Sequence, residues 1–427
     1  MAVALVFAAG VVNPTSAQEL LQPNPSIHGT LNVWGWNIAA ASLINLIPSF
    51  NERYPNVKVD VVTSGTAMQS RFLLSLAANV GAPDVSQLQM YDAPRFSPSG
   101  RLLDLTERAK KYEGQFSPAF WQACLHENRI YAIPWDMGPC AVFYKRDLFA
   151  KYHVDPDAIE TWADYIEVGK RIVRESNGKT MMMALSVGWL FDMFEILMQQ
   201  NGGGVFDPEG RIIINSPQNL EALEVLRALL DSKITAAMNP FSHEFYASMS
   251  DDSIASYPMA VWFGGSARDY TKGTAGNWGV FRLPAIQPGG LRNSNLGGSV
   301  LVIPEQCPQP DAAWAFIEYV LCNKQAQLEQ YRKFDLFPCL MTTFDDPFFD
   351  EPDPFYGGQK VRRLFATDIE KIPPLTRTSD WNEARRYVMQ ALTLWAGDRT
   401  DSGEFLAHME SRLHRKLGRA IATPETR

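Results

Sequence analysis

The stretch Val57-Lys58-Val59-Asp60-Val61-Val62, together with the residues that follow it, decides the fold class. β-branched side chains dominate this run, as they do in strands, and residues 67–78 then form a helix-like stretch. A second strand pattern, Leu31-Asn32-Val33-Trp34-Gly35-Trp36-Asn37, precedes this pair. Because strand and helix patterns alternate along the chain, we expect an α/β fold in which sheets are flanked by helices.

Several helix starts support this interpretation. Ser216-Pro217 combines a capping residue with proline at the first helical position, and leucines then recur on one face of the expected helix. A second start lies at Pro310, and residues 405–417 have a similar pattern. These patterns predict amphipathic helices that pack on sheets.

The length of the chain indicates two domains. At 427 residues it exceeds the roughly 250–300 residues at which a single core stops growing. Proline and glycine punctuate strand-like segments at 133–139, 282–285 and 336–338, which we interpret as crossings of a hinge between two lobes. The predicted division is an N-terminal lobe of residues 29–138 and 286–338, and a C-terminal lobe of residues 139–285 and 339–427.

The N-terminus has features of an export signal. An apolar run over 2–12 is too short for a membrane span, which needs about 20 residues, and Thr15-Ser16-Ala17 suits signal peptidase. We therefore expect a signal peptide over 1–17 and a soluble, periplasmic mature protein. The alternative is a disordered or partly buried N-terminal tail, since no Lys or Arg precedes the apolar run.

Composition and motifs exclude several functions. A net charge of −8 argues against a nucleic-acid surface, which needs basic patches. Five widely spaced cysteines suit buried free thiols better than a disulfide framework, although one bridge remains an alternative. The six histidines have no ligand spacing, and no nucleophile or phosphate-loop motif is present, so we predict no metal, no cofactor and no catalytic residue.

Aromatic residues beside short polar ones are the main functional signal. The apolar faces of a sugar stack on aromatic rings, and its hydroxyls need charged or amide partners once they are buried. Such sets occur where strands end or loops begin, which favours sugar recognition. They are Trp36-Asn37, Tyr91-Asp92, Trp135-Asp136, Trp189 with Asp192, Trp262-Phe263-Gly264-Gly265, and Trp381-Asn382.

These residues lie within a wider resemblance over about 29–417. The chain resembles the extracellular solute-binding proteins of carbohydrate ABC importers, the family that includes maltose-binding protein. Asn295-Leu296-Gly297-Gly298-Ser299 and Asp353 to Val361 are similar to the branch that handles lactose, arabinose and related oligosaccharides. The stretches that carry the wider resemblance are 31–36, 50–59, 82–85, 100–105, 131–134, 142–149, 161–164 and 258–261.

The resemblance implies a two-lobed periplasmic-binding-protein fold with a multi-strand hinge and a sugar site in the cleft. It gives Gly264 and Gly265 the role of permitting close backbone approach, and Trp381 that of an aromatic platform in the second lobe. The residues implied at the site are Trp36, Asn37, Gln69, Tyr91, Asp92, Asp136, Trp189, Asp192, Trp262, Gly264, Gly265, Gly297, Gly298 and Trp381.

The implied mechanism is binding without chemistry. A monomer captures a sugar, closes about its hinge and delivers the ligand to a membrane permease. Three alternatives stay open. A secreted carbohydrate-active enzyme would need two carboxylates about 5–9.5 Å apart across the sugar. The other two are a sensory binding protein that serves no transporter, and a receptor for a phosphorylated polyol gripped by Arg268 and Arg385.

Overall fold

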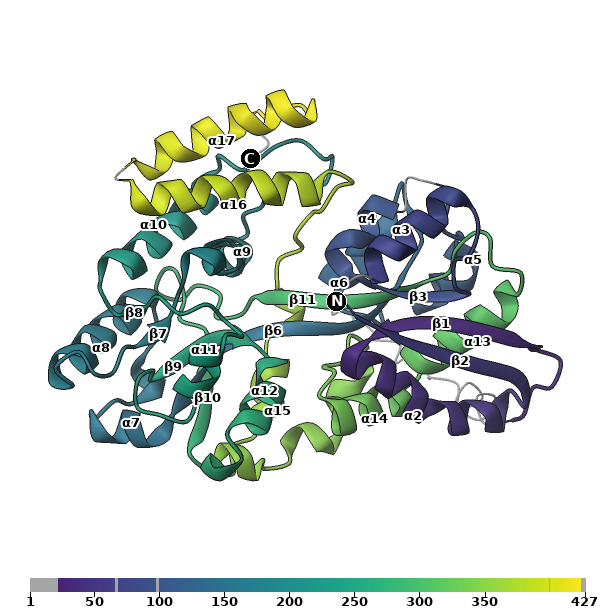
Figure 1. Ribbon diagram of the computed structural model, residues 1–427, viewed down its shortest axis with the longest axis horizontal. Helices are drawn as coiled ribbons and strands as arrows, with labels where there is room; N and C mark the ends of the chain where they lie inside the picture. The colour runs from purple at the N-terminus through teal and green to yellow at the C-terminus, as the bar shows by residue number, and fades with distance from the viewer. Residues whose placement is uncertain (1–21, 66–67, 97–99, 399, 424–427) are drawn as a thin grey trace, which may run out of the picture.

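The protein consists of two lobes joined by long strands (Figure 1). The structure is a computed structural model that describes residues 22–65, 68–96, 100–398 and 400–423. The predicted signal peptide over 1–17 lies outside the described residues. The expectation of an α/β fold is confirmed, because sheet strands and helices alternate through both lobes.

One seven-stranded sheet passes through both lobes. Its strand order is β10-β6-β11-β3-β1-β2, and β9 pairs with β6 beside this path. The pairs β1–β2 and β1–β3 are parallel, whereas β11 is antiparallel to both β3 and β6. The strands are β1 (His28–Trp36), β2 (Asn56–Ser64), β3 (Val85–Gln89), β6 (Ile133–Lys145), β9 (Ser256–Ala260), β10 (Trp278–Arg282) and β11 (Asn295–Val302).

Strand β6 belongs to both lobes because it changes partners along its length. Its first half, from Ile133 to Pro139, pairs with β11 in the N-terminal lobe. From Cys140 onward it pairs with β9 and β10 in the C-terminal lobe. Within this second half, Ala141 and Phe143 pack into the apolar core that extends into the N-terminal lobe. The alternate residues Cys140, Val142 and Tyr144 pack into the separate core of the C-terminal lobe. Both faces of the strand are therefore buried, which explains its nearly unbroken apolar sequence.

In the N-terminal lobe, helices pack against the parallel strands and against the start of β6. The helix predicted over 67–78 is observed from Met68, and the predicted start at Pro310 is confirmed. The helices of this lobe are α2 (Asn37–Arg53), α3 (Met68–Ala78), α4 (Ala93–Phe96), α5 (Thr106–Ala109), α6 (Pro118–Ala123), α13 (Pro310–Leu321) and α14 (Lys324–Phe334), with the hairpin β4 (Leu125–His126) and β5 (Arg129–Ile130).

In the C-terminal lobe, α8, α9, α10, α16 and α17 form a second core over one face of β6, β9 and β10. The predicted start at Ser216 is confirmed, since Ser216 accepts a bond from Asn219 N. Helix α8 begins after Thr161, which forms a capping box with Asp164. The helices are α7 (Arg146–Lys151), α8 (Trp162–Glu175), α9 (Leu190–Gln200), α10 (Pro217–Asp231), α11 (His243–Ser248), α12 (Phe263–Tyr270), α15 (Val361–Ala366), α16 (Trp381–Gly397) and α17 (Ser402–Leu417), with the short strands β7 (Met183–Ala184) and β8 (Thr235–Ala236).

The chain passes between the lobes along β6, along β11 and through the segment after α14. Residues 283–285 stay in the C-terminal lobe, where Ala285 pairs with the backbone of Glu160, so the second passage follows at β11. After α14, Phe337 and Pro338 lie beside Asp136 and Met137 of β6. The lobe boundaries given above remain a prediction.

Two further observations bear on expectations from the sequence. All five cysteines are free thiols, and four of them are buried, as small apolar residues often are. Among the described residues, helices long and apolar enough for a membrane span are absent.

Candidate functional site

The ends of two parallel strands bring polar side chains to one edge of the sheet. Strand β1 ends at Trp36, whose backbone N–H donates to Gln87 of the neighbouring strand β3 at 3.0 Å. Asn37 follows with a left-handed backbone (φ +49°) and an exposed side chain. Strand β3 leads into the turn η1 (Met90–Asp92). Ligands of α/β sheets bind at the carboxyl ends of such strands, so this edge is a candidate site.

Asp92 connects this edge to the opposite lobe. Its carboxyl is buried and accepts a hydrogen bond from the Asn382 amide at the start of α16. Burial raises the pKa of Asp92, while the hydrogen bonds from Asn382 and Gln69 and the positive charge of Arg95 oppose that rise. Tyr91 beside it packs against the core of the C-terminal lobe, and burial raises its pKa as well. Gln69, Tyr91 and Asp92 are therefore brought together where the lobes meet.

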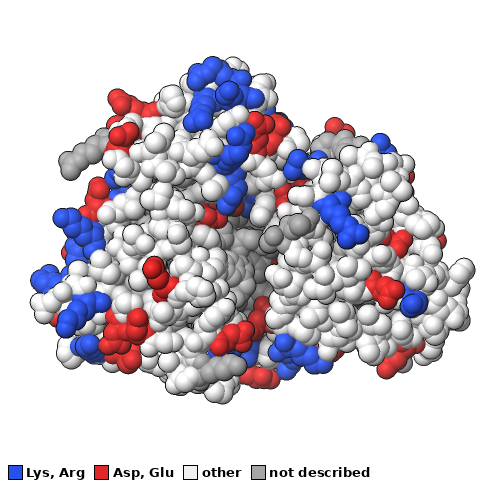
Figure 2. Space-filling model, in the orientation of Figure 1, with Lys and Arg blue, Asp and Glu red and all other residues white. Residues whose placement is uncertain are grey.

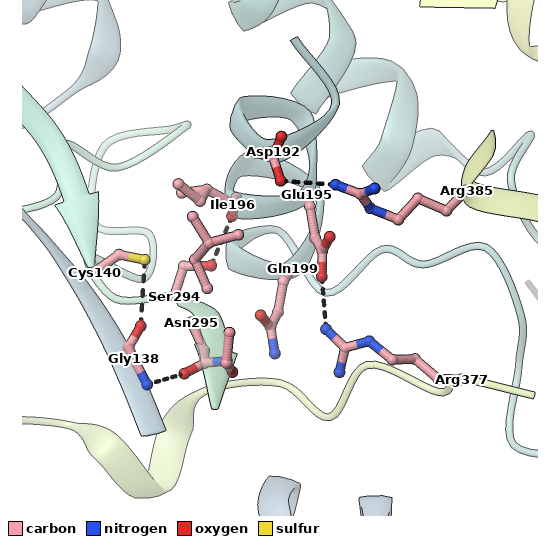
Figure 3. Close-up of polar contacts among 12 residues, drawn as sticks. Gly138, Cys140, Asp192, Glu195, Ile196, Gln199, Ser294, Asn295, Arg377 and Arg385 are labelled. Carbon is pink, nitrogen blue, oxygen red and sulfur yellow. Dashed lines mark hydrogen bonds and ion pairs between the residues drawn. The ribbon is translucent and has the colours of Figure 1, made fainter. Parts of the chain in front are cut away.

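Helix α9 carries a row of polar residues that face α16 and the segment before it (Figure 3). Asp192 pairs with Arg385 at 3.0 Å, and Glu195 pairs with Arg377 at 2.6 Å. The second pair is deeply buried, with side chains 7% and 5% exposed. Burial raises the pKa of Asp192, and Arg385 opposes that rise. Both carboxylates of α9, Asp192 and Glu195, therefore have arginine partners from their own lobe.

Glycines shape the hinge where β6 and β11 cross. Gly297 and Gly298 have φ values of +84° and +114°, and the pairing register shifts at this point. A Cβ on Gly298 would come within 2.8 Å of the Asp136 carbonyl, so only glycine fits there. Asn295 bridges the strands by accepting from Gly138 N at 2.8 Å (Figure 3). It also donates to the Gly297 carbonyl.

Asp136 lies at this crossing, beside the segment that follows α14. Its Oδ1 atom is buried without a hydrogen-bond partner. Burial raises the pKa of Asp136 to about 6, although its contacts with Ser299 oppose the rise. The structure thus places Asp136 among the hinge strands.

Three aromatic residues of the C-terminal lobe have neighbouring rings, and two of them, Trp189 and Trp262, pack against both apolar cores. Trp189 and Trp262 are half-buried, and between them lies Phe241, with ring centroids 5.8 Å from Trp189 and 5.9 Å from Trp262. Trp262 is fixed by donating from Nε1 to the Leu296 carbonyl of β11 at 3.0 Å. Phe241 could not be singled out from the sequence, since its only local signal is the turn-forming Asn239-Pro240 before it.

Two of the expected site residues, Trp381 and Gly264, lie elsewhere than the resemblance implied. Trp381 is only 1% exposed, because its ring packs against Phe191 in the core of the C-terminal lobe. Gly264 lies under the Tyr356 hydroxyl, which is 2.5 Å from a Cβ built there, and Gly265 faces Asp335. Gly264 therefore allows α12 to pack closely on Tyr356, whereas a side chain at Gly265 would make only ordinary contact with Asp335 at 3.6 Å. It is Asn382, rather than Trp381, that contacts the opposite lobe.

A cavity of about 440 Å³ also lies between the lobes. Gln122 and His126 line it from the N-terminal lobe, and Arg377, Thr378 and Arg419 line it from the other. Figure 2 shows that the molecule is hollowed between its two lobes. Within the described part of the chain, clusters of three or more possible metal ligands are absent.

Comparison with known proteins identifies the family. Residues 35–327 match the bacterial extracellular solute-binding protein family, and this match covers more than half of the chain. The chain therefore belongs to this family of binding proteins. The geometry described above, two lobes around a cleft with a strand hinge, is consistent with that membership.

Curated relatives and solved structures extend the comparison. An arabinooligosaccharide-binding protein of Bacillus subtilis is 28% identical over 85% of this chain and 86% of its own. A lactose-binding protein of Rhizobium radiobacter is 23% identical over 84% and 86%. Two solved structures share the fold. The sugar-binding protein MalE of Xanthomonas citri has a TM-score of 0.78 at 19% identity over 91% and 98% of the chains. A binding protein of B. animalis subsp. lactis, solved with β-1,6-galactobiose, has a TM-score of 0.75 at 24% identity over 93% and 100%.

Proposed function

We propose that this protein is a receptor that captures a neutral mono- or oligosaccharide between its lobes and delivers it to an ABC permease. The observation that carries the proposal is the composition of the cleft. We place the half-buried aromatic rings of the C-terminal lobe opposite the amide and carboxylate groups at the strand ends of the N-terminal lobe, where Asp92 already contacts Asn382 of the other lobe. Rings take the apolar faces of a sugar, and these polar groups take its hydroxyls. Trp36, Asn37, Gln69, Tyr91, Asp92, Trp189 and Trp262 are the binding residues we propose.

Relatives support a carbohydrate ligand and an exported location. The curated relatives are named for arabinooligosaccharides and lactose, and the family is described as extracellular. We place the mature protein in the periplasm as a monomer that works without a cofactor and without nucleic acid. Affinity would come from the closed state, because a ligand shifts the balance only through contacts that are better when the lobes are closed.

The paired arginines disfavour a phosphorylated ligand. Arg385 is held by Asp192 at 3.0 Å. Arg268 pairs with both Asp335 and Asp353 at 2.7 Å. A phosphate would have to displace these carboxylates before it could use either guanidinium, and this would leave negative charges unpaired.

The enzyme alternative has no comparable support. Asp192 is already committed to an arginine, and Asp92 to an amide from the facing lobe. A general acid and a nucleophile must instead both be directed at the sugar bond. We therefore propose binding without turnover.

The test is a titration of tryptophan fluorescence with arabinose, galactose, arabinooligosaccharides, lactose, β-1,6-galactobiose and glycerol 3-phosphate, with chromatography of each mixture after prolonged incubation. We expect saturable binding of a neutral saccharide and recovery of that saccharide intact. Binding of glycerol 3-phosphate alone, or the appearance of shortened sugars, would contradict the proposal.

A pair of tryptophan variants separates binding from folding. Trp189→Ala should weaken saccharide binding while leaving the melting temperature nearly unchanged, because its ring is half-buried at the cleft. Trp381→Ala should instead cost about 3–5 kcal/mol of stability, as for other core tryptophans. Unchanged affinity in Trp189→Ala would remove Trp189 from the site.

A further inference from the structure

Phe241 has a backbone conformation that bulky residues rarely adopt. Its φ is +67°, in the left-handed region. Such strain persists only where the surroundings impose it, and it is concentrated at ligand-binding and switch positions. Phe241 follows Asn239-Pro240 and precedes Ser242, which caps α11 by accepting from Phe245 N. The turn is thus held from both ends.

This conformation keeps the Phe241 ring at the surface. The side chain is 42% exposed, although a phenylalanine would normally be buried. Phe245 and Tyr246 of α11 contact the ring at centroid distances of 6.0 and 6.4 Å. In Figure 1, α11 lies beside α12, the helix that Trp262 precedes. The ring is therefore supported by protein while a large part of it stays accessible.

The rings of Trp189, Phe241 and Trp262 follow one another but do not share a plane. Phe241 is tilted by 75° from Trp189 and by 38° from Trp262. A flat sugar ring stacks on one plane at a time. A single sugar unit therefore cannot stack on all three rings, whereas a chain of sugar units that bends from one ring to the next can.

We propose that Phe241 is a ligand-binding residue that selects for saccharide length, so that the ligand of this cleft has two or more sugar units. The inference rests on the proposed function, because it assumes that the cleft binds saccharides. It adds that Phe241 contacts a unit other than the one on Trp189. The rings of Trp189, Phe241 and Trp262 then form one continuous binding surface, which we call the aromatic row.

The test is isothermal titration calorimetry of the full chain with two matched series, arabinose, arabinobiose and arabinotriose, and galactose with β-1,6-galactobiose. The variants are Phe241→Gly, which removes the ring and adopts positive φ freely, and Phe241→Tyr, which keeps the ring. Tyr270→Ala is the control, since Tyr270 is 55% exposed but stacks on Tyr246, outside the aromatic row. Melting temperatures are measured for all.

Phe241→Gly should weaken binding of the di- or trisaccharide about tenfold and change monosaccharide binding by less than about twofold, given the usual value of an aromatic contact. Its melting temperature should change little, because the relief of backbone strain opposes the loss of ring packing on Phe245 and Tyr246. Phe241→Tyr and Tyr270→Ala should bind like the wild type.

Three results would overturn the inference while leaving the proposed function intact. These are wild-type affinity in Phe241→Gly, an equal loss for mono- and oligosaccharides, and a fall in affinity that accompanies a lowered melting temperature. If the wild-type protein binds no saccharide of either series and no lactose, the proposed function fails and the inference fails with it.

Discussion

The two walls of the cleft hold their polar groups in different ways. On the C-terminal wall, Asp192 and Glu195 are neutralised by arginines of the same lobe, on a helix packed into a core. On the N-terminal wall, Asp92 takes its amide partner from the opposite lobe. The first arrangement survives opening of the cleft, whereas the second exists only while the lobes are in contact. The C-terminal wall is therefore preformed, and the N-terminal wall is completed by closure.

The largest expected effect on stability comes from removing the buried arginine partner of Glu195. Arg377→Met leaves Glu195 buried without its partner, and we expect a loss of about 3–5 kcal/mol in the free energy of unfolding. Urea denaturation measures it. Lys170→Met is the matched control, because the Lys170–Glu167 pair is solvent-exposed and should cost about 0.5 kcal/mol or less. Equal effects of the two variants would show that the Glu195–Arg377 pair is not buried in solution.

The next effect concerns the hinge between the walls and depends on pH. Burial raises the pKa of Asp136 from 3.8 to about 6, so the folded state binds its proton more tightly than the unfolded state does. The stabilisation that protonated Asp136 contributes to the folded state is therefore fully present below pH 3.8. It is lost as the pH rises through about 6. Asp136→Asn should stabilise the protein by about 3 kcal/mol at pH 7, with the gain vanishing near pH 4.

Denaturation curves of wild type and Asp136→Asn from pH 4 to pH 8 provide the measurement. Asp60→Asn is the control, since the Asp60 side chain is 68% exposed. A stabilisation that does not vary with pH would mean that the carboxyl of Asp136 is already ionised at low pH in the folded state.

The smallest effect concerns the hydrogen bond between Asn382 and Asp92, which joins the two lobes. Asn382→Ala removes the amide that Asp92 accepts from, so closure loses one hydrogen bond to a charged group, and we expect about tenfold weaker ligand binding. X-ray scattering should show a more open average shape. Glu383→Gln, one residue further along α16, should leave both properties unchanged. Wild-type affinity in Asn382→Ala would mean that this contact does not contribute to closure.

Local signals in the sequence were sufficient for the framework of the fold. The helix starts at Ser216-Pro217 and at Pro310 depend on residues within a few positions of one another, and both are observed. The alternating strand and helix patterns likewise gave the α/β class, and the family resemblance gave the two lobes.

The site was harder to predict because its contacts join distant residues. Nothing local tells whether Trp381 or Asn382 faces the cleft, since one turn of α16 presents one residue to the core and its neighbour outward. The pairing of Asp192 with Arg385 spans 193 residues. Phe241 was missed because its strained backbone and exposed ring are properties of the folded turn.

The sharing of β6 between the lobes also bears on how the protein folds. The N-terminal lobe needs β11 and α13, which come after residue 294, and the core of the C-terminal lobe includes Leu413. Neither lobe can complete its core until most of the chain is present. Contacts of such long sequence separation slow folding. We therefore expect slow refolding and a single cooperative unfolding transition, in spite of the two-lobed shape.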